Sequence, residues 1–202
     1  MFVVFDASFL VPLLDPQING AGEVDKRIEF LLKTLEIAKA KIFIPTPALS
    51  EVLIGAGDAA PQYLDIINKS SRFEVVPFGE RAAVEAAAAH REAIGAGNKK
   101  EGSASWAKVK FDRQIVAIAK VEGVDRIYSN DADIVRFAAR DAIAVITIEQ
   151  LPLPPTGQQG TLPLEQDALH FMASEHLCGP RQIVSSVVGQ PTVATAHAFA
   201  RR

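Results

Sequence analysis

The stretch FVVFD at residues 2–6 decides the fold. Its four apolar residues, all β-branched or aromatic, run without a break into an acid, which is typical of a strand buried on both faces of a parallel sheet. A second run, RIYSND at residues 126–131, also ends in an acid. Because ligands of open α/β sheets bind beyond the carboxyl ends of the strands, we expect Asp6 and Asp131 to face one crevice.

Strand and helix patterns alternate along the rest of the chain. Short apolar runs predict strands at residues 2–5, 41–44, 73–76, 125–129 and 143–148. Apolar periodicity, alanine content and a Thr-Pro start with Thr46 as N-cap predict helices at residues 23–39, 47–55, 80–94, 105–121 and 131–140, with a shorter helix from Pro61. This alternation predicts a three-layer α/β/α fold with a central parallel sheet of four or five strands.

The composition changes at Leu151. The 202 residues are 49% hydrophobic and 22% charged, which suits a globular protein. The segment LPLPPTGQQG, which begins at residue 151, suits neither a helix nor a central strand. We therefore expect a globular domain at residues 1–150, a Pro/Gly-rich linker at 151–163 and a partly helical C-terminal extension at 164–202.

Charge, cysteine content and hydropathy narrow the class of protein. The net charge of −3 means that any binding of nucleic acid must depend on a local basic face. Cys178 is the only cysteine, which excludes an intrachain disulfide, and we favour a free thiol there over a zinc site with His170 and His176. Neither a secretion leader nor a membrane span is predicted, so we expect a cytoplasmic protein without membrane contact.

Two further acids lie on helix faces that are otherwise apolar. Asp112 precedes Ile115 and Val116 by three and four residues, which places it on the same, buried helix face. An ionised carboxylate there is costly unless it is paired or bound to a cation. Glu51 is expected to be similar to Asp112, since it lies among apolar residues of a predicted helix that carries little other charge.

Each acid alone has a simpler explanation. Asp6 and Asp131 could cap helices, Asp112 could pair with a lysine, and Glu51 could favour a helix start. Taken together at one sheet edge, however, the carboxylates would repel one another unless a divalent cation compensated their charge. Hard oxygen ligands of this kind select Mg²⁺ or Mn²⁺.

Four separated segments carry these acids, namely VFDASFL (residues 4–10), PTPALSE (45–51), FDRQIVAIA (111–119) and YSNDADI (128–134). They resemble, in the same order, the acidic motifs of the PIN-domain nucleases, and within that family the VapC-like toxin ribonucleases of bacterial toxin–antitoxin pairs. The resemblance covers about residues 1–150. It departs from the family at Ile134, where an aromatic residue is frequent, and beyond Leu151, where compact toxins have no counterpart.

The resemblance implies a PIN-like fold and a Mg²⁺- or Mn²⁺-dependent endoribonuclease that hydrolyses RNA phosphodiester bonds, with the toxin of a toxin–antitoxin pair as a narrower identity. It implies Asp6, Glu51, Asp112 and Asp131 as catalytic metal ligands. Asp133 joins the metal site as a supporting or helix N-terminal acid, and Ser8 and Asn130 orient the ligands.

The same resemblance implies partners for the chain. We expect single-stranded or structured RNA, a cognate antitoxin and a second copy in a homodimer. Basic residues near Asp112 could attract the RNA backbone, although they could equally form a solvated helix face. These RNA-binding candidates are Lys99, Lys100, Lys108, Lys110 and Arg113.

Two other functions remain open at this point. A catalytically silent PIN-like binding or scaffolding domain would keep the fold without turnover. An aspartyl-phosphate phosphatase would use Asp6 as the nucleophile, but Ser8 replaces the second Asp that the phosphatase motif requires. The metal-dependent ribonuclease is therefore the favoured prediction.

Overall fold

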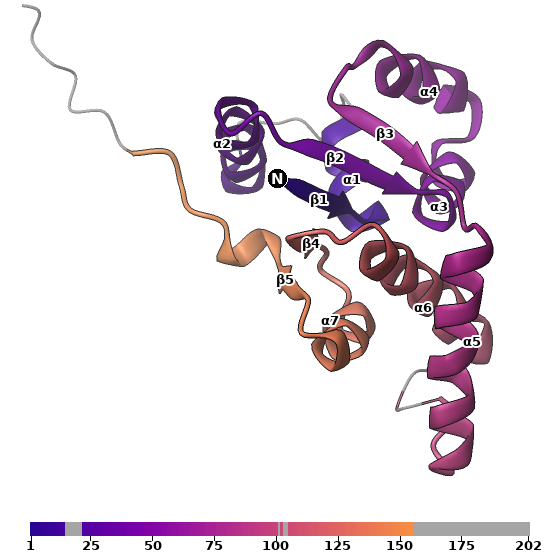
Figure 1. Ribbon diagram of the computed structural model, residues 1–202. Coiled ribbons are helices and arrows are strands. Elements are labelled where there is room, and N and C mark those ends of the chain that lie inside the picture. Colours follow the sequence, from indigo (N-terminus) through magenta and orange to yellow (C-terminus); the bar gives the residue numbers. More distant parts are fainter. Residues whose placement is uncertain (15–21, 101, 103–104, 156–202) are drawn as a thin grey trace, which may run out of the picture. The chain divides into compact units, whose positions relative to one another are not determined.

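The computed structural model describes residues 1–14, 22–100, 102 and 105–155. Met1–Thr156 forms one compact unit (Figure 1). The predicted C-terminal extension, most of the linker, and the thiol and histidines at residues 170–178 lie outside the described residues. Among the helices that are described, none has the length and apolar character needed to cross a membrane.

A parallel sheet forms the centre of the unit, as predicted. The described residues contribute five strands in the order β3-β2-β1-β4-β5. All four neighbouring pairs are parallel. The strands are β1 (Phe2–Phe5), β2 (Lys41–Pro45), β3 (Phe73–Val76), β4 (Arg126–Tyr128) and β5 (Ala144–Ile146).

Helices connect successive strands and cover both faces of the sheet, which completes the predicted three layers (Figure 1). The α-helices are α1 (Ala7–Leu14), α2 (Glu23–Ile37), α3 (Thr46–Ala56), α4 (Ala60–Lys69), α5 (Glu80–Gly95), α6 (Trp106–Val121) and α7 (Ala132–Ala138). Short 3₁₀ helices are η1 (Gly57–Ala59), η2 (Ala139–Asp141) and η3 (Ile148–Gln150).

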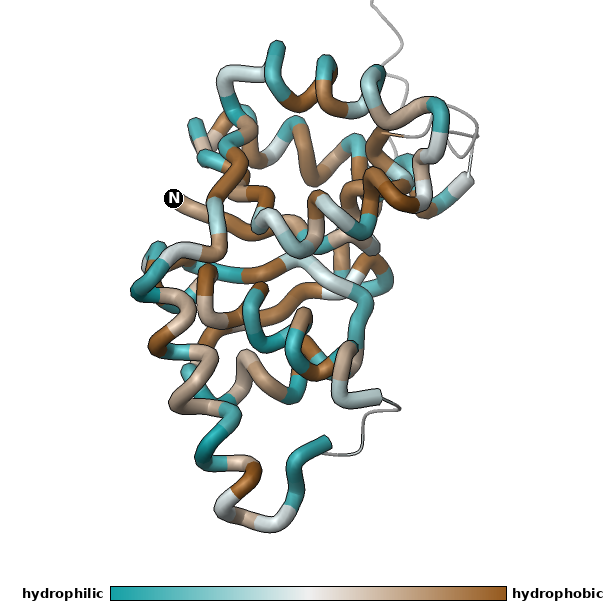
Figure 2. Tube along the Cα trace, turned by 90° about the vertical axis from the view of Figure 1, so that its right-hand side faces the viewer, coloured by the Kyte–Doolittle hydropathy of each residue, from teal (hydrophilic) through white to brown (hydrophobic). Residues whose placement is uncertain are grey.

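The two faces of the sheet bury two separate hydrophobic clusters. Side chains alternate along each strand, so that Val3 and Phe5 join the cluster with α1 and α2 while Val4 joins the one with α5, α6 and α7. In the same way β4 sends Ile127 to one face and Tyr128 to the other. Figure 2 shows the resulting arrangement, with hydrophobic segments along the strands and hydrophilic segments on the outer helices. Burial on both faces explains why these strands are continuous apolar runs.

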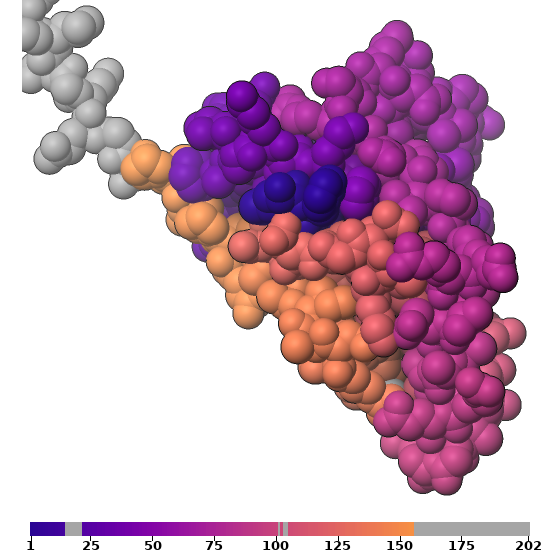
Figure 3. All heavy atoms as spheres, in the orientation of Figure 1, coloured from indigo at the N-terminus to yellow at the C-terminus, as the bar shows by residue number. Residues whose placement is uncertain are grey.

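The first strand lies in the middle of the sheet, between β2 and β4. In the space-filling view, the indigo atoms at the start of the chain lie between purple atoms, which come from the first half of the unit, and orange-red atoms, which come from its second half (Figure 3). Residues that follow β1 are therefore flanked by residues from both halves of the unit.

Two local predictions need correction. The sequence analysis did not predict α1, because Pro12 lies inside this eight-residue helix and its apolar composition gives weak periodicity. Thr46 is not the N-cap of α3, which begins at Thr46 after Pro45. Its hydroxyl instead accepts a hydrogen bond from the Phe78 amide at 3.1 Å and so ties α3 to the segment after β3.

Ile127 tests the importance of β4, the strand that pairs with the central strand β1. Its side chain is fully buried, so Ile127→Ala is expected to lower the free energy of unfolding by about 2–5 kcal/mol, through lost burial and a cavity. Urea denaturation followed by circular dichroism measures the change. Ile37→Ala is the matched control, since Ile37 is 83% exposed, and it should have little effect. Equal losses in the two variants would contradict the assignment of Ile127 to the core.

Candidate metal centre

The topology of the sheet creates the site. The chain progresses outward from β1 through β2 to β3 on one side, and from β4 to β5 on the other, so the strand order reverses between β1 and β4. The backbone N–H of Asp6 donates to the Tyr128 carbonyl at 3.1 Å, which continues the pairing of these strands. A crevice is expected at such a reversal. Here it is a cleft of about 440 Å³, lined by Asp6, Ala7, Ser8, Val11, Glu51, Gly55, Asp112, Asn130 and Asp131.

Asp6 is the deepest acid of the cleft. It is 5% exposed, and its Oδ2 accepts hydrogen bonds from the hydroxyls of Ser129 at 2.9 Å and Ser8 at 3.2 Å. Burial raises the pKa of Asp6, and these hydrogen bonds oppose the rise. The carboxylate is thus held in one orientation by groups that favour its charged form.

Ser129 was missed by the sequence analysis and joins two of the predicted acids. The residue is fully buried. Its hydroxyl donates to Asp6 and accepts a hydrogen bond from the Asp131 amide at 3.0 Å. The sequence position of Ser129 could have revealed this role, because a hydroxyl at the end of β4 lies beside the residue that follows β1.

Asp112, Asp131 and Asp133 form the tightest group of carboxylates in the described residues. One oxygen from each lies within 4.8 Å of the others. Lys108 contacts all three, with Nζ at 2.7 Å from Asp112 Oδ2, 2.6 Å from Asp131 Oδ2 and 3.0 Å from Asp133 Oδ2. Arg136 binds the other oxygen of Asp133. The predicted pairing of Asp112 with a lysine is therefore present in this structure.

Helix geometry places these acids. Asp112 lies on the buried face of α6 with Ile115 and Val116, as predicted. Asp131 is the N-cap of α7 and accepts a hydrogen bond from the Asp133 amide at 2.7 Å through Oδ1. The capping explanation for Asp131 is thus also correct, and it is compatible with a site role because Oδ2 remains directed to Lys108.

Burial and the charges of the cleft raise the pKa values of two further acids, Asp112 and Glu51. Burial raises the pKa of Asp112 to about 6; Lys108 opposes this rise, while Asp131 and Asp133 add to it. The pKa of Glu51 is raised by burial and by the charges of Asp6 and Asp131. Glu51 nevertheless belongs to the exposed residues, so the predicted similarity to Asp112 is wrong: Glu51 lies at the rim of the cleft.

The residues present fit a divalent metal ion. Opposite ligands of an octahedral Mg²⁺ lie roughly 4 Å apart, close to the 4.8 Å limit within which the three aspartate oxygens lie. Asp6 and Glu51 supply further oxygens in the same cleft. The predicted quartet thus shares one cleft, but the tight oxygen group contains Asp133 together with Asp112 and Asp131. All of these ligands are hard oxygens of the kind that Mg²⁺ and Mn²⁺ select.

The predicted supporting residues differ in what they do. Ser8 donates to Asp6 and accepts the Asn130 amide at 2.9 Å, as a supporting hydroxyl should. The side chain of Asn130 points elsewhere, because its Oδ1 accepts from the Ile148 amide at 2.9 Å. Asn130 therefore anchors η3, and only its backbone contributes to the order of the site.

Three of the five predicted RNA-binding residues are exposed, namely Lys99, Lys100 and Lys110. Lys99 Nζ lies 4.4 Å from the centre of the Trp106 ring. Arg113 is 3% exposed and contacts His90 Nδ1 at 2.6 Å, so its side chain does not form part of this exposed basic surface. Lys108 faces the acids rather than the solvent around α6.

Comparison with known proteins identifies the architecture. The PIN domain family matches residues 3–140, more than half of the chain. Two similar structures are VapBC2 from Rickettsia felis bound to a DNA fragment from their promoter (16% identity, TM-score 0.53) and DNA-bound VapBC from Salmonella typhimurium (16% identity, TM-score 0.51). Each alignment covers 73% of this chain and 98% of the other. No curated protein matches the sequence.

The raised pKa of Asp112 predicts how stability depends on pH. Its ordinary value is 3.8 and its folded value about 6, so the folded state binds this proton more tightly than the unfolded state does. Stability without metal should therefore fall as the pH rises from about 4 to about 7. The raised pKa values of Asp6 and Glu51 act in the same direction.

Urea denaturation in EDTA at several pH values measures this slope. Asp112→Asn should flatten it by removing one titrating group, whereas Asp65→Asn, at a 57% exposed side chain on α4, should leave it unchanged. A wild-type protein whose stability rises steadily over this pH range would contradict the sign.

Proposed function

Given that the chain belongs to the PIN-domain family of nucleases, we propose that it is a metal-dependent endoribonuclease that hydrolyses RNA phosphodiester bonds. The observation that carries the proposal is the cleft at the reversal of the strand order. Asp6, Glu51, Asp112 and Asp131 come from four separate parts of the chain and line this one cleft. Carboxylates this close together repel one another and destabilise the folded state unless a bound cation offsets their charge.

Each residue has a defined part in this proposal. Asp6, Glu51, Asp112 and Asp131 hold a Mg²⁺ or Mn²⁺ ion, and Asp133 completes the group. An ion held by these residues would supply Lewis-acid chemistry, both for a phosphate oxygen and for the water that attacks it. Ser8 and Ser129 fix the orientation of the Asp6 carboxylate. A network of this kind is what positions metal ligands in general.

Binding of RNA depends on a local basic surface, because the chain is acidic overall. Lys99, Lys100 and Lys110 supply exposed positive charge at the start of α6 and just before it. Trp106 packs against His90, with ring centres 4.9 Å apart, and carries Lys99 on its ring. We assign the lysines to contacts with the phosphate backbone and Trp106 to support of Lys99.

We further propose that the chain is the toxin of a toxin–antitoxin pair, active in the cytoplasm as a homodimer. The acidic motifs support this identity by their resemblance to VapC-like toxins. Similarity to the VapBC structures supports the fold that such a toxin requires. A cognate antitoxin is then the expected protein partner.

One observation favours the second candidate function, a catalytically silent PIN-like domain. The ammonium group of Lys108 forms ion pairs with Asp112, Asp131 and Asp133 and so offsets part of their charge. A domain that had lost turnover could retain its acids in this way. The two functions differ in whether the purified protein cleaves RNA.

Cleavage of labelled single-stranded RNA tests the proposal directly. With Mn²⁺ or Mg²⁺ the wild-type protein should cut internally, and EDTA should stop the reaction. Asp6→Asn and Asp131→Asn should each lower the rate by about 100-fold or more, the upper end of what loss of a supporting group costs a metal site. Asp65→Asn should retain full activity. Equal inactivity of the wild type and both site variants would favour the silent domain.

Growth measurements test the toxin identity. Induced expression of the wild-type chain should arrest bacterial growth, whereas the Asp6→Asn chain at equal abundance should not, because it lacks a metal ligand. Co-expression of a small DNA-binding protein encoded beside the gene should restore growth and co-purify with the chain. Arrest by both chains would show that any toxicity is independent of the acidic cleft.

A further inference from the structure

We propose that Lys108 is an internal counter-cation of the acidic cleft, and that a divalent ion enters by displacing its ammonium group from Asp112, Asp131 and Asp133. The inference rests on the proposed metal centre and deepens it. It assigns to Lys108 a control of metal affinity, in place of the RNA contact that the sequence suggested.

The contacts of Lys108 are unusually complete. An ammonium group has three N–H donors, and here three carboxylates lie at hydrogen-bonding distance, between 2.6 and 3.0 Å from Nζ. These three acids are also the group whose oxygens approach one another within 4.8 Å. The lysine therefore contacts the closest group of carboxylate oxygens, which includes two acids that line the cleft, Asp112 and Asp131.

The ammonium group and a divalent ion exclude each other there. A Mg²⁺ ion lies about 2.1 Å from its ligand oxygens, and Nζ lies at most 3.0 Å from oxygens of the same carboxylates. Two cations that share the same ligands at these distances would repel strongly in a partly buried site. Entry of the metal therefore requires Nζ to leave.

The position of Lys108 permits this exchange. It lies in the first turn of α6, and 39% of its side chain is exposed, so its flexible stem can turn toward solvent. Arg136 does not need to move, because it binds Asp133 through Oδ1 while Lys108 uses Oδ2. One cation thus leaves and one stays when the ion binds.

Competition of this kind lowers the apparent affinity for metal. If the ammonium group occupies the site nine-tenths of the time, the apparent affinity is reduced about tenfold. Lys108→Met removes the competitor and keeps most of the apolar stem. It should therefore bind Mn²⁺ about tenfold more tightly than the wild type, and its metal-free form should have a lower melting temperature because three carboxylates lose their cation.

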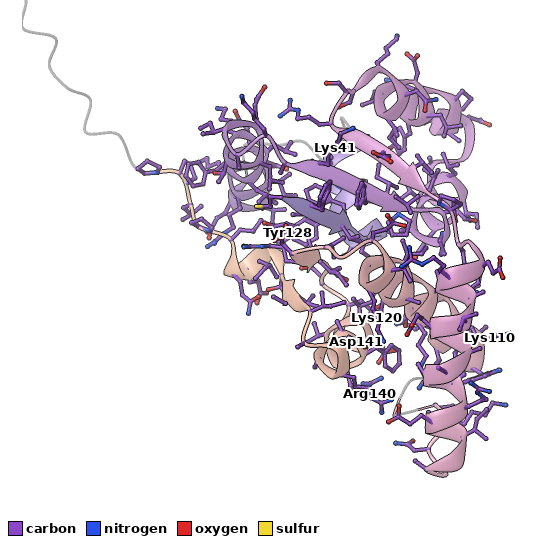
Figure 4. The ribbon with its side chains drawn as sticks, in the orientation of Figure 1. Lys41, Lys110, Lys120, Tyr128, Arg140 and Asp141 are labelled. Atoms are coloured by element: carbon purple, nitrogen blue, oxygen red, sulfur yellow. The ribbon has the colours of Figure 1, made fainter. Side chains whose placement is uncertain are left out.

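Lys120→Met is the matched control. Lys120 lies on the same helix and also bridges two acids, Glu85 at 2.7 Å and Asp141 at 2.9 Å, outside the cleft; Lys120 and Asp141 are labelled in Figure 4. This variant loses a comparable lysine and should bind Mn²⁺ within about twofold of the wild type, since no competition is relieved. Calorimetric titration of the full chain with Mn²⁺, without RNA, measures the three affinities.

Lys108→Arg is a second test in case Lys108→Met does not fold. This variant keeps the positive charge beside the three carboxylates. It should bind Mn²⁺ no more tightly than the wild type does. The inference is overturned if Lys108→Met gains no affinity, if Lys120→Met gains as much, or if Lys108→Arg gains. Absence of Mn²⁺ binding by every variant would overturn it together with the metal centre. A gain by Lys108→Met alone, in a protein that cleaves no RNA, would support the inference while the ribonuclease proposal fails.

Discussion

The parallel pairing of β1 with β4 is the constraint on which the site depends. Phe5 pairs with Tyr128, and the hydrogen bond from Asp6 to the Tyr128 carbonyl carries the pairing one residue further. Asp6 and Asp131 are distant in sequence, yet each lies just beyond one of these neighbouring strands. Ser129 then joins them through one buried hydroxyl. Since both strands are buried on both faces, the core that stabilises the sheet also fixes the distance between the acids.

Electrostatics sets the second constraint. Burial raises the pKa values of Asp6, Glu51 and Asp112, and neighbouring acids add to the rise for Glu51 and Asp112. The folded state therefore disfavours the ionised form of these carboxyl groups relative to water. Lys108 and Arg136 reduce the repulsion by pairing with three of the acids. A fold gains nothing in stability from crowded carboxylates that need such compensation. Their concentration in one cleft is therefore better explained by chemistry than by stability.

The sequence predicted the strands, most helices and the shared location of the four acids, because each of these follows from a local pattern. Continuous apolar runs revealed the buried strands, and the periodicity around Asp112 revealed its buried face. Side-chain pairing could not be predicted in the same way. Whether Lys108 points to solvent or to Asp131, 23 residues away, depends on how α6 and α7 pack. For the same reason the sequence did not reveal that Arg113 is buried, that Glu51 is exposed, or that Ser129 links Asp6 to Asp131.

Charge balance connects the proposed metal centre to the proposed binding of RNA. Five carboxylates lie in or beside the cleft. Lys108 and Arg136 form ion pairs with three of them, Asp112, Asp131 and Asp133. A cleft with this excess of negative charge repels a phosphate group. In the exchange proposed for Lys108, entry of a divalent ion adds two positive charges and also frees the ammonium group four residues from Asp112. Both changes favour a phosphate at the same place, so the proposed exchange would couple metal binding to attraction of the RNA backbone. In an acidic protein such coupling would add to the positive charge that the local basic surface of Lys99, Lys100 and Lys110 supplies.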